Sequence, residues 1–391
     1  MGAEHGIEHG GQPLIAMHQH LAAAIAALEQ AGLKRSLKTV TTAQGAEVES
    51  DSLRLLNFSS NDYLGLATEP VLAAAAIEAI ARHGTGAGAS RLISGTLSPH
   101  TSLEAELARW KGTKSALTFS SGYATAVGTL GALTGPEDVI ILDKLCHACI
   151  IDGARLSGAV LRVYPHNNLE RLESHLRWAR LKHPRGKIII ATESVFSMDG
   201  DCAPLREIVT LKERYGAWLL LDEAHAVGVF GASGAGLAEA EGLTERIEIH
   251  MGTLSKAMGC AGGYICGADV LVEWLANKAR SFMFSTAPPP ALAATGEAAV
   301  RWMASSDGAH RRSLLWRNIG HFQKCTNIAR PPESAIVPIP VGSNEAAITA
   351  SKRLQATAFE EKNGFWVPAI RYPTVPRGTA RLRVTLSALH S

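Results

Sequence analysis

Apolar residues along the chain follow two repeating patterns. Leucine, isoleucine and alanine recur at helical spacing over residues 14–33, which predicts an amphipathic helix near the N-terminus. From about residue 115, stretches of helical periodicity alternate with short apolar runs, which are residues 116–119, 139–142, 160–164, 187–191 and 218–221. This alternation is typical of βαβ units, so the sequence predicts an α/β fold with a mostly parallel central sheet.

A run of three prolines, at residues 288–290, indicates a domain junction. After it come a helical stretch and two predicted strands, near residues 335–341 and 381–386. We therefore expect an N-terminal helix and extension over residues 1–60, a large domain over 61–290 and a small α/β C-terminal domain over 291–391. A chain of 391 residues suits more than one domain, at roughly 150 residues each.

The composition disfavours several classes of protein. Apolar residues make up 46% and charged residues 19%, and the net charge of +2 gives no field that would attract nucleic acid or an anionic membrane. No apolar stretch approaches the roughly 20 residues of a spanning helix. Residues 1–12 do not resemble a secretory signal. Six cysteines in so long a chain favour free thiols. We expect a cytoplasmic enzyme with no nucleic-acid partner and no membrane association.

An acidic residue, Asp222, directly follows the three leucines 219–221. It is expected at the carboxyl end of a buried strand, where open α/β sheets bind ligands. The letters Asp-Glu-Ala-His at 222–225 also name a helicase box, but that activity needs a phosphate loop, and the nearest candidate, at 186–188, lacks the hydroxyl residue. An Asp that merely caps the next helix remains an alternative.

Lys256 stands in a turn of small and apolar residues over 252–259. Because burying an ammonium is costly, such a lysine has a lowered pKa and suits a Schiff base. A lysine on an exposed turn remains the alternative. The separation of Lys256 from Asp222 suits adjacent strands of one sheet, and the hydroxyls of Thr253 and Ser255 suit a phosphate.

Three further segments suggest ligand contacts. Gly122 and Tyr123 follow an apolar run and a Ser-Ser turn, and this strand–turn–helix pattern favours an anion at the helix N-terminus. His147 lies within a Cys-x-x-Cys motif and could stack on a flat ring. With no second such motif in the chain, we expect core thiols and no metal site. Arg371 lies in a proline-rich turn that would fix a guanidinium for carboxylate binding, although a surface arginine is the alternative.

Taken with residues 57–66, 90–96 and 368–390, these motifs resemble the α-oxoamine synthases, a family of pyridoxal-phosphate (PLP) enzymes. The resemblance covers about residues 33–390. It implies pyridoxal 5'-phosphate as cofactor and the fold type I of the aspartate aminotransferases, with a mostly parallel sheet and a smaller α/β C-terminal domain. It also implies a homodimer.

The resemblance also implies an activity, the condensation of an amino acid with an acyl thioester and loss of CO2. Within the family the sequence is most similar to members that use L-alanine and a pimeloyl thioester, either pimeloyl-CoA or pimeloyl-acyl carrier protein. Members that use glycine or serine with another acyl-CoA, and aminotransferases of the same fold, remain alternatives. A non-catalytic partner subunit is a further alternative, but such subunits lack the Schiff-base lysine that this chain has at Lys256.

The resemblance assigns four residues to the reacting part of the cofactor. Lys256 forms the Schiff base, and Asp222 pairs with the pyridine nitrogen. His225 donates a hydrogen bond to the phenolic oxygen, and His147 stacks on the ring. Ser197 is expected near the phenolic oxygen and the acyl carbonyl.

The other assigned residues concern the phosphate and the substrates. Backbone groups of Gly122 and Tyr123 and the Thr253 hydroxyl are expected to hold the phosphate, to which Thr286 would be donated by the neighbouring subunit. For the substrates, the resemblance points to Asn61 and Arg371 as contacts of a substrate carboxylate and to Arg35 as a contact of the acyl-chain carboxylate.

Overall fold

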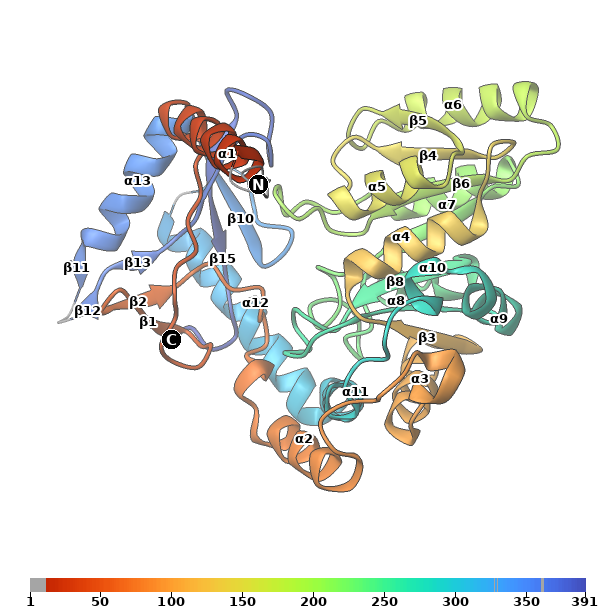
Figure 1. The fold of residues 1–391 in the computed structure, drawn as a ribbon, viewed down its shortest axis with the longest axis horizontal. Coiled ribbons are helices and arrows are strands. Elements are labelled where there is room, and N and C mark those ends of the chain that lie inside the picture. Colours follow the sequence, from red (N-terminus) through yellow and green to blue (C-terminus); the bar gives the residue numbers. More distant parts are fainter. Residues whose placement is uncertain (1–11, 327, 329, 360–361) are drawn as a thin grey trace, which may run out of the picture.

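The computed structural model describes residues 12–326, 328, 330–359 and 362–391. Figure 1 shows two sheet-containing parts beside each other, a larger one on the right and a smaller one, with the C-terminus, on the left. One hydrophobic core cluster contains residues of both parts, for example Leu103, Met303 and Val384, so the two parts pack together.

The larger part is built on a seven-stranded sheet. Across the sheet the strands are β3 (Ser115–Phe119), β9 (Gly263–Gly267), β8 (Ile249–Thr253), β7 (Trp218–Asp222), β6 (Ile188–Glu193), β4 (Val139–Asp143) and β5 (Val160–Tyr164). β9 runs antiparallel to β3 and β8, and all other neighbours are parallel. The five strands predicted from apolar runs and the mostly parallel sheet are therefore confirmed.

Helices cover both faces of this sheet, and β4, β6 and β8 are therefore buried along their whole length. One face packs against α4 (Gly122–Leu133), α5 (Ala148–Leu156), α9 (Asp269–Lys278) and α10 (Arg280–Met283). The other packs against α6 (Leu169–Lys182), α7 (Leu205–Arg214) and α8 (Leu237–Ala240).

The smaller part contains two three-stranded sheets. In the first, β10 (Ile336–Gly342), β15 (Ala380–Thr385) and β14 (Ala369–Ile370) are antiparallel, which confirms the two strands predicted there. In the second, the hairpin of β1 (Glu47–Ser50) and β2 (Leu53–Asn57) pairs with β13 (Phe365–Trp366). The N-terminal extension thus lies against C-terminal residues. The domain boundaries at residues 60 and 290 stay predictions.

Several helices connect and flank the two parts, and α11 packs against both α2 and α3. The remaining elements are α2 (Pro70–His83), α3 (Ser98–Lys111), α11 (Pro290–Ala304), α12 (Ser306–Thr326), α13 (Asn344–Ala356), the short strands β11 (Ala358–Phe359) and β12 (Lys362–Asn363), and the short helices η1 (Leu66–Thr68), η2 (Arg91–Gly95) and η3 (Thr244–Arg246).

The predicted N-terminal helix is present as α1 (Gln12–Gln30). Its large apolar side chains, such as Leu14, Met17 and Leu21, are exposed, so the described part of the chain leaves the apolar residues of this helix uncovered. None of the described helices has both the length and the apolar character needed to cross a bilayer.

Candidate active site

Four neighbouring parallel strands end on buried polar residues. β4 ends at Asp143, β6 at Glu193, β7 at Asp222 and β8 at Thr253. Because these strands are parallel, their carboxyl ends lie at one edge, where such sheets bind ligands. The strand register places Glu193 directly beside Asp222. The predicted position of Asp222 is confirmed, and Glu193 is a polar neighbour that the sequence interpretation missed.

Lys256 lies in the loop after β8, next to the end of β7, since these two strands are adjacent as the motif spacing predicted. Its Nζ is 2.9 Å from Nε2 of His225. Burial lowers the pKa of Lys256, while the nearby carboxylates of Asp222 and Glu193 act in the opposite direction. A lowered pKa increases the share of neutral amine, which is the form that attacks a carbonyl carbon.

His225 connects Lys256 to Tyr63, a second residue that the sequence interpretation missed. Its Nδ1 is 2.6 Å from the Tyr63 hydroxyl. Burial holds the pKa of His225 well below its usual value, so the ring is neutral. If Lys256 donates to Nε2, the ring proton is on Nδ1 and is donated to Tyr63. Burial also raises the pKa of Tyr63 to about 12, so this hydroxyl stays protonated.

Asp222 is buried, and its Oδ1 accepts a hydrogen bond of 2.9 Å from the backbone N–H of Ala224. Burial raises the pKa of Asp222, and the charge of Lys256 lowers it. Among the described residues, no side-chain donor lies within hydrogen-bonding distance of this carboxylate. Its negative charge would therefore be stabilised by a cationic group of a ligand.

The strand–turn–helix expected at residues 120–123 is present, since β3 ends at Phe119 and α4 begins at Gly122. Ser121 caps the helix, its Oγ accepting from the N–H of Ala124 at 3.1 Å. A Cβ at Gly122 would lie 3.5 Å from the Thr253 hydroxyl, an ordinary contact distance, so the helix N-terminus and Thr253 are neighbours. The Thr253 hydroxyl donates to the carbonyl of Gly262 at 2.8 Å. The N-terminus of α4 therefore offers backbone N–H donors for an anion beside Thr253.

Glu193 joins the two segments that carry His147 and Ser197. Its Oε1 accepts from the N–H of His147 at 2.6 Å, and its Oε2 accepts from the N–H of Ser197 at 3.3 Å. Burial, with a smaller contribution from Asp222, raises the pKa of Glu193 to about 8. His147 itself caps α5, its Nδ1 accepting from the N–H of Cys149 at 3.2 Å. Burial lowers the pKa of His147, and Lys256 lowers it further.

Arg383, on β15, is a third residue that the sequence interpretation missed. It is buried, with its Nε donating to the Ser197 carbonyl at 2.6 Å and its Nη2 donating to Oδ1 of Asn61 at 3.1 Å. Asn61 and Ser197 thus accept hydrogen bonds from the same guanidinium. The only sequence signal was a charged residue at an inward-facing position of a strand.

Three predicted residues have no described contact with this centre. Arg371 donates to the Lys34 carbonyl at 3.0 Å, and Arg35 donates to the Thr374 hydroxyl at 3.2 Å. Burial lowers the pKa of Arg371, as does the neighbouring charge of Arg35, so the two guanidinium groups lie close together. Thr286 is exposed and pairs with Ser90 in an isolated bridge.

The residues at this sheet edge fit PLP. Lys256 offers an amine of lowered pKa for the aldehyde, and Asp222 offers a buried carboxylate for the ring nitrogen. The N-terminus of α4, next to Thr253, offers N–H groups for the phosphate.

Comparison with known proteins agrees with this chemistry. The 8-amino-7-oxononanoate synthase of Geobacter sulfurreducens is 46% identical over 378 residues, which cover 96% of this chain and 94% of the relative. The protein of the same name from Herminiimonas arsenicoxydans is 45% identical over 382 residues, 96% of each chain.

Solved structures agree as well. A serine palmitoyltransferase variant from S. paucimobilis, with a PLP–myriocin adduct, is 30% identical with a TM-score of 0.87 over 97% of this chain and 94% of that one. The 8-amino-7-oxononanoate synthase of Francisella tularensis is 27% identical with a TM-score of 0.71, over 86% and 93%. The fold class and the resemblance inferred from the sequence are confirmed. Since the aminotransferase class I and II family also matches residues 54–391, this chain belongs to that family.

Proposed function

We propose that the chain condenses L-alanine with a pimeloyl thioester, using PLP, to give 8-amino-7-oxononanoate, CO2 and free thiol. The observation that carries the proposal is the hydrogen-bonded pair Lys256–His225 beside the buried Asp222, in a chain whose curated relatives bear the name of this activity. When bound, PLP supplies a ring that accepts electrons from the Cα of the amino acid.

Lys256 has two roles in this proposal. Its amine would hold PLP at the aldehyde carbon, and when free it would accept the Cα proton of the amino acid. Both roles need the neutral amine, which the lowered pKa supports. Asp222 holds a proton on the ring nitrogen, because a buried carboxylate stabilises a cation beside it. His147 would cover the ring. Once Lys256 has moved from Nε2, His225 could donate from Nε2 to the phenolic oxygen as the other neutral tautomer, with its Nδ1 accepting from the Tyr63 hydroxyl.

The phosphate contacts are proposed at Gly122, Tyr123 and Thr253. The N-terminus of α4 directs backbone N–H groups toward an anion, and the Thr253 hydroxyl lies next to Gly122. Thr286 is proposed to contact the phosphate of the second subunit of a homodimer. Its exposure in the single chain leaves it accessible to a partner.

Arg383 is proposed as an addition to Asn61 and Arg371 in binding the substrate carboxylate. Its guanidinium already holds Asn61, and it also holds the carbonyl of Ser197, a residue proposed to contact the phenolic oxygen. Arg371 lies beside Arg35 instead, so it could meet the carboxylate of alanine or the far carboxylate of the acyl chain. Arg35 is proposed for the acyl-chain carboxylate. We also propose a cytoplasmic location.

A panel of amino acids and acyl thioesters tests the proposal. Free thiol and CO2 would be measured with alanine, glycine and serine, each with pimeloyl-CoA, pimeloyl-acyl carrier protein and a longer acyl-CoA. We expect release of both products with alanine and a pimeloyl donor. A preference for glycine or serine would assign a related synthase, and transfer of the amino group to a 2-oxo acid would assign an aminotransferase.

A labelling experiment tests the cofactor separately from the substrates. Borohydride reduction of the holoenzyme, followed by digestion and mass spectrometry, is expected to locate the reduced cofactor on Lys256. A label on another lysine would contradict the assigned site, whichever substrates prove active.

A further inference from the structure

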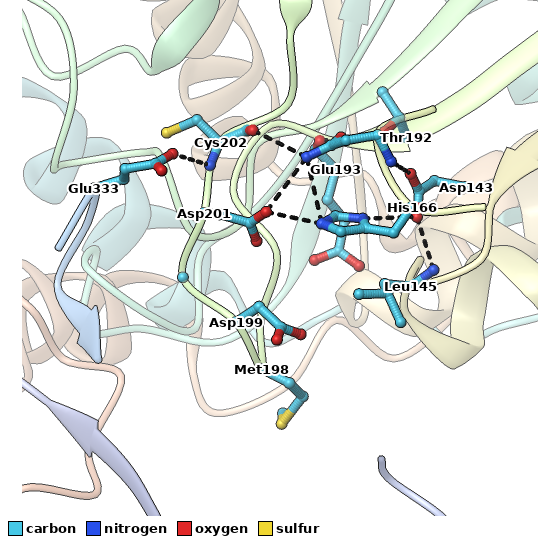
Figure 2. A network of polar contacts seen from close by, with 12 residues as sticks. Asp143, Leu145, His166, Thr192, Glu193, Met198, Asp199, Asp201, Cys202 and Glu333 are labelled. Atoms are coloured by element: carbon cyan, nitrogen blue, oxygen red, sulfur yellow. Dashed lines mark hydrogen bonds and ion pairs between the residues drawn. The ribbon is translucent and has the colours of Figure 1, made fainter. Parts of the chain in front are cut away.

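A polar network lies between the segments that carry His147 and Ser197 (Figure 2). At its centre is His166, whose Nδ1 is 3.1 Å from Oδ1 of Asp143 and whose Nε2 is 2.8 Å from Oδ2 of Asp201. Asp143 is the last residue of β4, just before His147, and Asp201 lies just beyond Ser197. The proposed function gives no role to His166 or to either carboxylate.

Asp143 shapes the turn that leads to His147. Its Oδ1 accepts from the N–H of Leu145 at 2.8 Å, and its backbone carbonyl accepts from the N–H of Cys146 at 3.1 Å. Its Oδ2 accepts from the N–H of Asn167 at 2.8 Å. Because this carboxylate is fully buried, its position fixes the path of residues 143–147.

Ser197 lies near the tip of a tight hairpin over residues 194–203. The N–H of Phe196 donates to the Asp201 carbonyl at 3.0 Å, and the N–H of Gly200 donates to the Phe196 carbonyl at 2.8 Å. His166 contacts both arms of this hairpin: its ring meets the Phe196 ring edge to face, with centroids 4.4 Å apart, and it also pairs with Asp201.

His166 makes both hydrogen bonds as a donor when it is charged. Burial lowers the pKa of His166, but its hydrogen bonds to Asp143 and Asp201 outweigh burial and raise the pKa to about 10. At neutral pH the ring is therefore an imidazolium, which has two N–H donors where the neutral ring has one. The ring also borders a cavity of about 210 Å³ whose other charged lining residues are Asp199, Asp201, Arg330 and Glu333.

We infer that His166 is a positioning residue, which ties the turn 143–147 to the hairpin 194–203 and so sets the placement of His147 relative to Ser197. This inference rests on the proposed function, which puts both of those residues against the cofactor. Glu193 is a second tie between the same segments, since it accepts from the backbone N–H groups of His147 and Ser197. Loss of His166 should therefore shift His147 relative to Ser197, while Glu193 still holds both segments at the site.

The test compares His166→Gln with His175→Gln in the PLP-loaded enzyme. His175 is a matched control on α6, partly buried like His166, with its Nε2 3.3 Å from the Val163 carbonyl. The Ser197 hydroxyl, if it donates to the phenolic oxygen, stabilises the phenolate anion. Displacing this hydroxyl therefore raises the pH midpoint at which the visible absorbance of the bound cofactor changes. We expect an upward shift of about one pH unit, a tenfold change in that equilibrium, in His166→Gln alone.

Two more measurements accompany the absorbance titration. The Kd of PLP for the apoprotein is expected to rise about tenfold, and kcat to fall about tenfold, less than the roughly hundredfold that a 1 Å misplacement can cost. If wild type fails to bind PLP, the proposed function is wrong. If wild type binds PLP and His166→Gln matches it in midpoint, Kd and kcat, the inference about His166 is wrong.

A double-mutant cycle separates positioning from a general structural effect. In a Ser197→Ala background, His166→Gln should move the absorbance midpoint by less than half as much, because the hydroxyl through which it acts is gone. A shift of full size in that background would overturn the inference. Should His166→Gln not fold, the near-isosteric Asp201→Asn weakens the same contact and is expected to show the same coupling to Ser197.

Discussion

Two adjacent acids, Asp222 and Glu223, lie at the end of β7. Similar residue types surround them, but the pKa of Asp222 is raised and that of Glu223 is lowered. Consecutive side chains of a strand point to opposite faces, so the two acids face different surroundings. Asp222 lies near Lys256, whose amine bonds to His225, and Glu223 lies near Lys111 and His250.

We call the groups around Glu223 a closed set, because they complete its hydrogen bonds and balance its charge. Its Oε2 is 2.5 Å from Nζ of Lys111, its Oε1 accepts from the N–H of Ala238 at 3.0 Å, and Nδ1 of His250 is 3.7 Å away. Although burial raises its pKa, the charge of Lys111 and the contact with His250 outweigh burial and lower the pKa of Glu223 to about 2. This carboxylate has its counter-charge within the protein.

We call the groups around Asp222 an open set, because no side chain of the described residues donates a hydrogen bond to its carboxylate. Lys256 and His225 bond to each other, and burial raises the pKa of Asp222. A buried acid without a direct counter-charge costs stability, and such groups concentrate at ligand sites. The contrast shows that residue types alone do not distinguish a structural cluster from a binding site. The distinction lies in whether the protein itself completes the hydrogen bonds and charges.

Replacing the acid of the open set should have the largest effect on activity. We expect Asp222→Asn to slow loss of the alanine Cα proton at least about ten-thousandfold, or about 5.4 kcal/mol, because an amide cannot hold a proton on the ring nitrogen. The melting temperature of the apoprotein should stay the same or rise, since a poorly paired buried charge is removed. Proton exchange followed by NMR, beside a thermal melt, measures both. Exchange near the wild-type rate would contradict the role of Asp222.

Replacing the acid of the closed set should act on stability instead. Glu223→Gln leaves the Lys111 ammonium buried without its counter-charge, so we expect a loss of about 3–5 kcal/mol in the free energy of unfolding. Denaturant unfolding of the apoprotein measures it. The double variant Glu223→Gln with Lys111→Met should recover part of the loss. Equal stability of Glu223→Gln and wild type would show that the set is not a closed ion pair.

The pH dependence of stability sharpens the same contrast. The folded-state pKa of Glu223 is about 2, below its ordinary value of 4.5, so its contribution is complete above pH 4.5 and is lost as pH falls toward 2. That difference corresponds to about 3 kcal/mol. Unfolding free energies between pH 6 and 3 should therefore fall less steeply in the Glu223→Gln, Lys111→Met double variant. Parallel curves would contradict the lowered pKa.

The sequence could predict what local pattern determines. Strand periodicity located Asp222 at a strand end, and the small-residue turn singled out Lys256. It could not separate Asp222 from Glu223, because the partner of Glu223 is Lys111, on α3, far away in the sequence. Tyr63 and Arg383 were missed for the same reason, since their contacts with His225 and Asn61 join distant segments.

The N-terminal helix shows the converse limit. Periodicity predicted α1 correctly, yet the burial implied by its apolar residues is missing in the described chain. Periodicity therefore predicts that a helix has an apolar face, but not what covers that face.

The smallest effect is expected at Arg371, a cation whose surroundings resemble the open set. Among the described residues its buried Nε has no hydrogen-bond partner, and its near neighbour Arg35 has the same charge, so an anionic ligand would complete both. A charge-assisted hydrogen bond contributes about 1.5–3 kcal/mol, so we expect Arg371→Ala to raise a substrate KM about ten- to hundredfold while the PLP Kd stays unchanged. Although Arg371→Lys keeps the charge, it loses the planar fork of the guanidinium, so it should behave like Arg371→Ala.

Steady-state kinetics with each substrate varied in turn decide which carboxylate Arg371 binds. A rise confined to the alanine KM assigns it the amino-acid carboxylate, and a rise confined to the thioester KM, matched by Arg35→Ala, assigns it the far end of the acyl chain. Arg377→Ala is the matched control, because Arg377 lies in the same proline-rich turn and packs on the Tyr372 ring at 4.2 Å. If Arg371→Ala leaves both KM values and kcat at wild-type levels, Arg371 is an ordinary surface arginine. It would then differ from Asp222, because no ligand completes its hydrogen bonds.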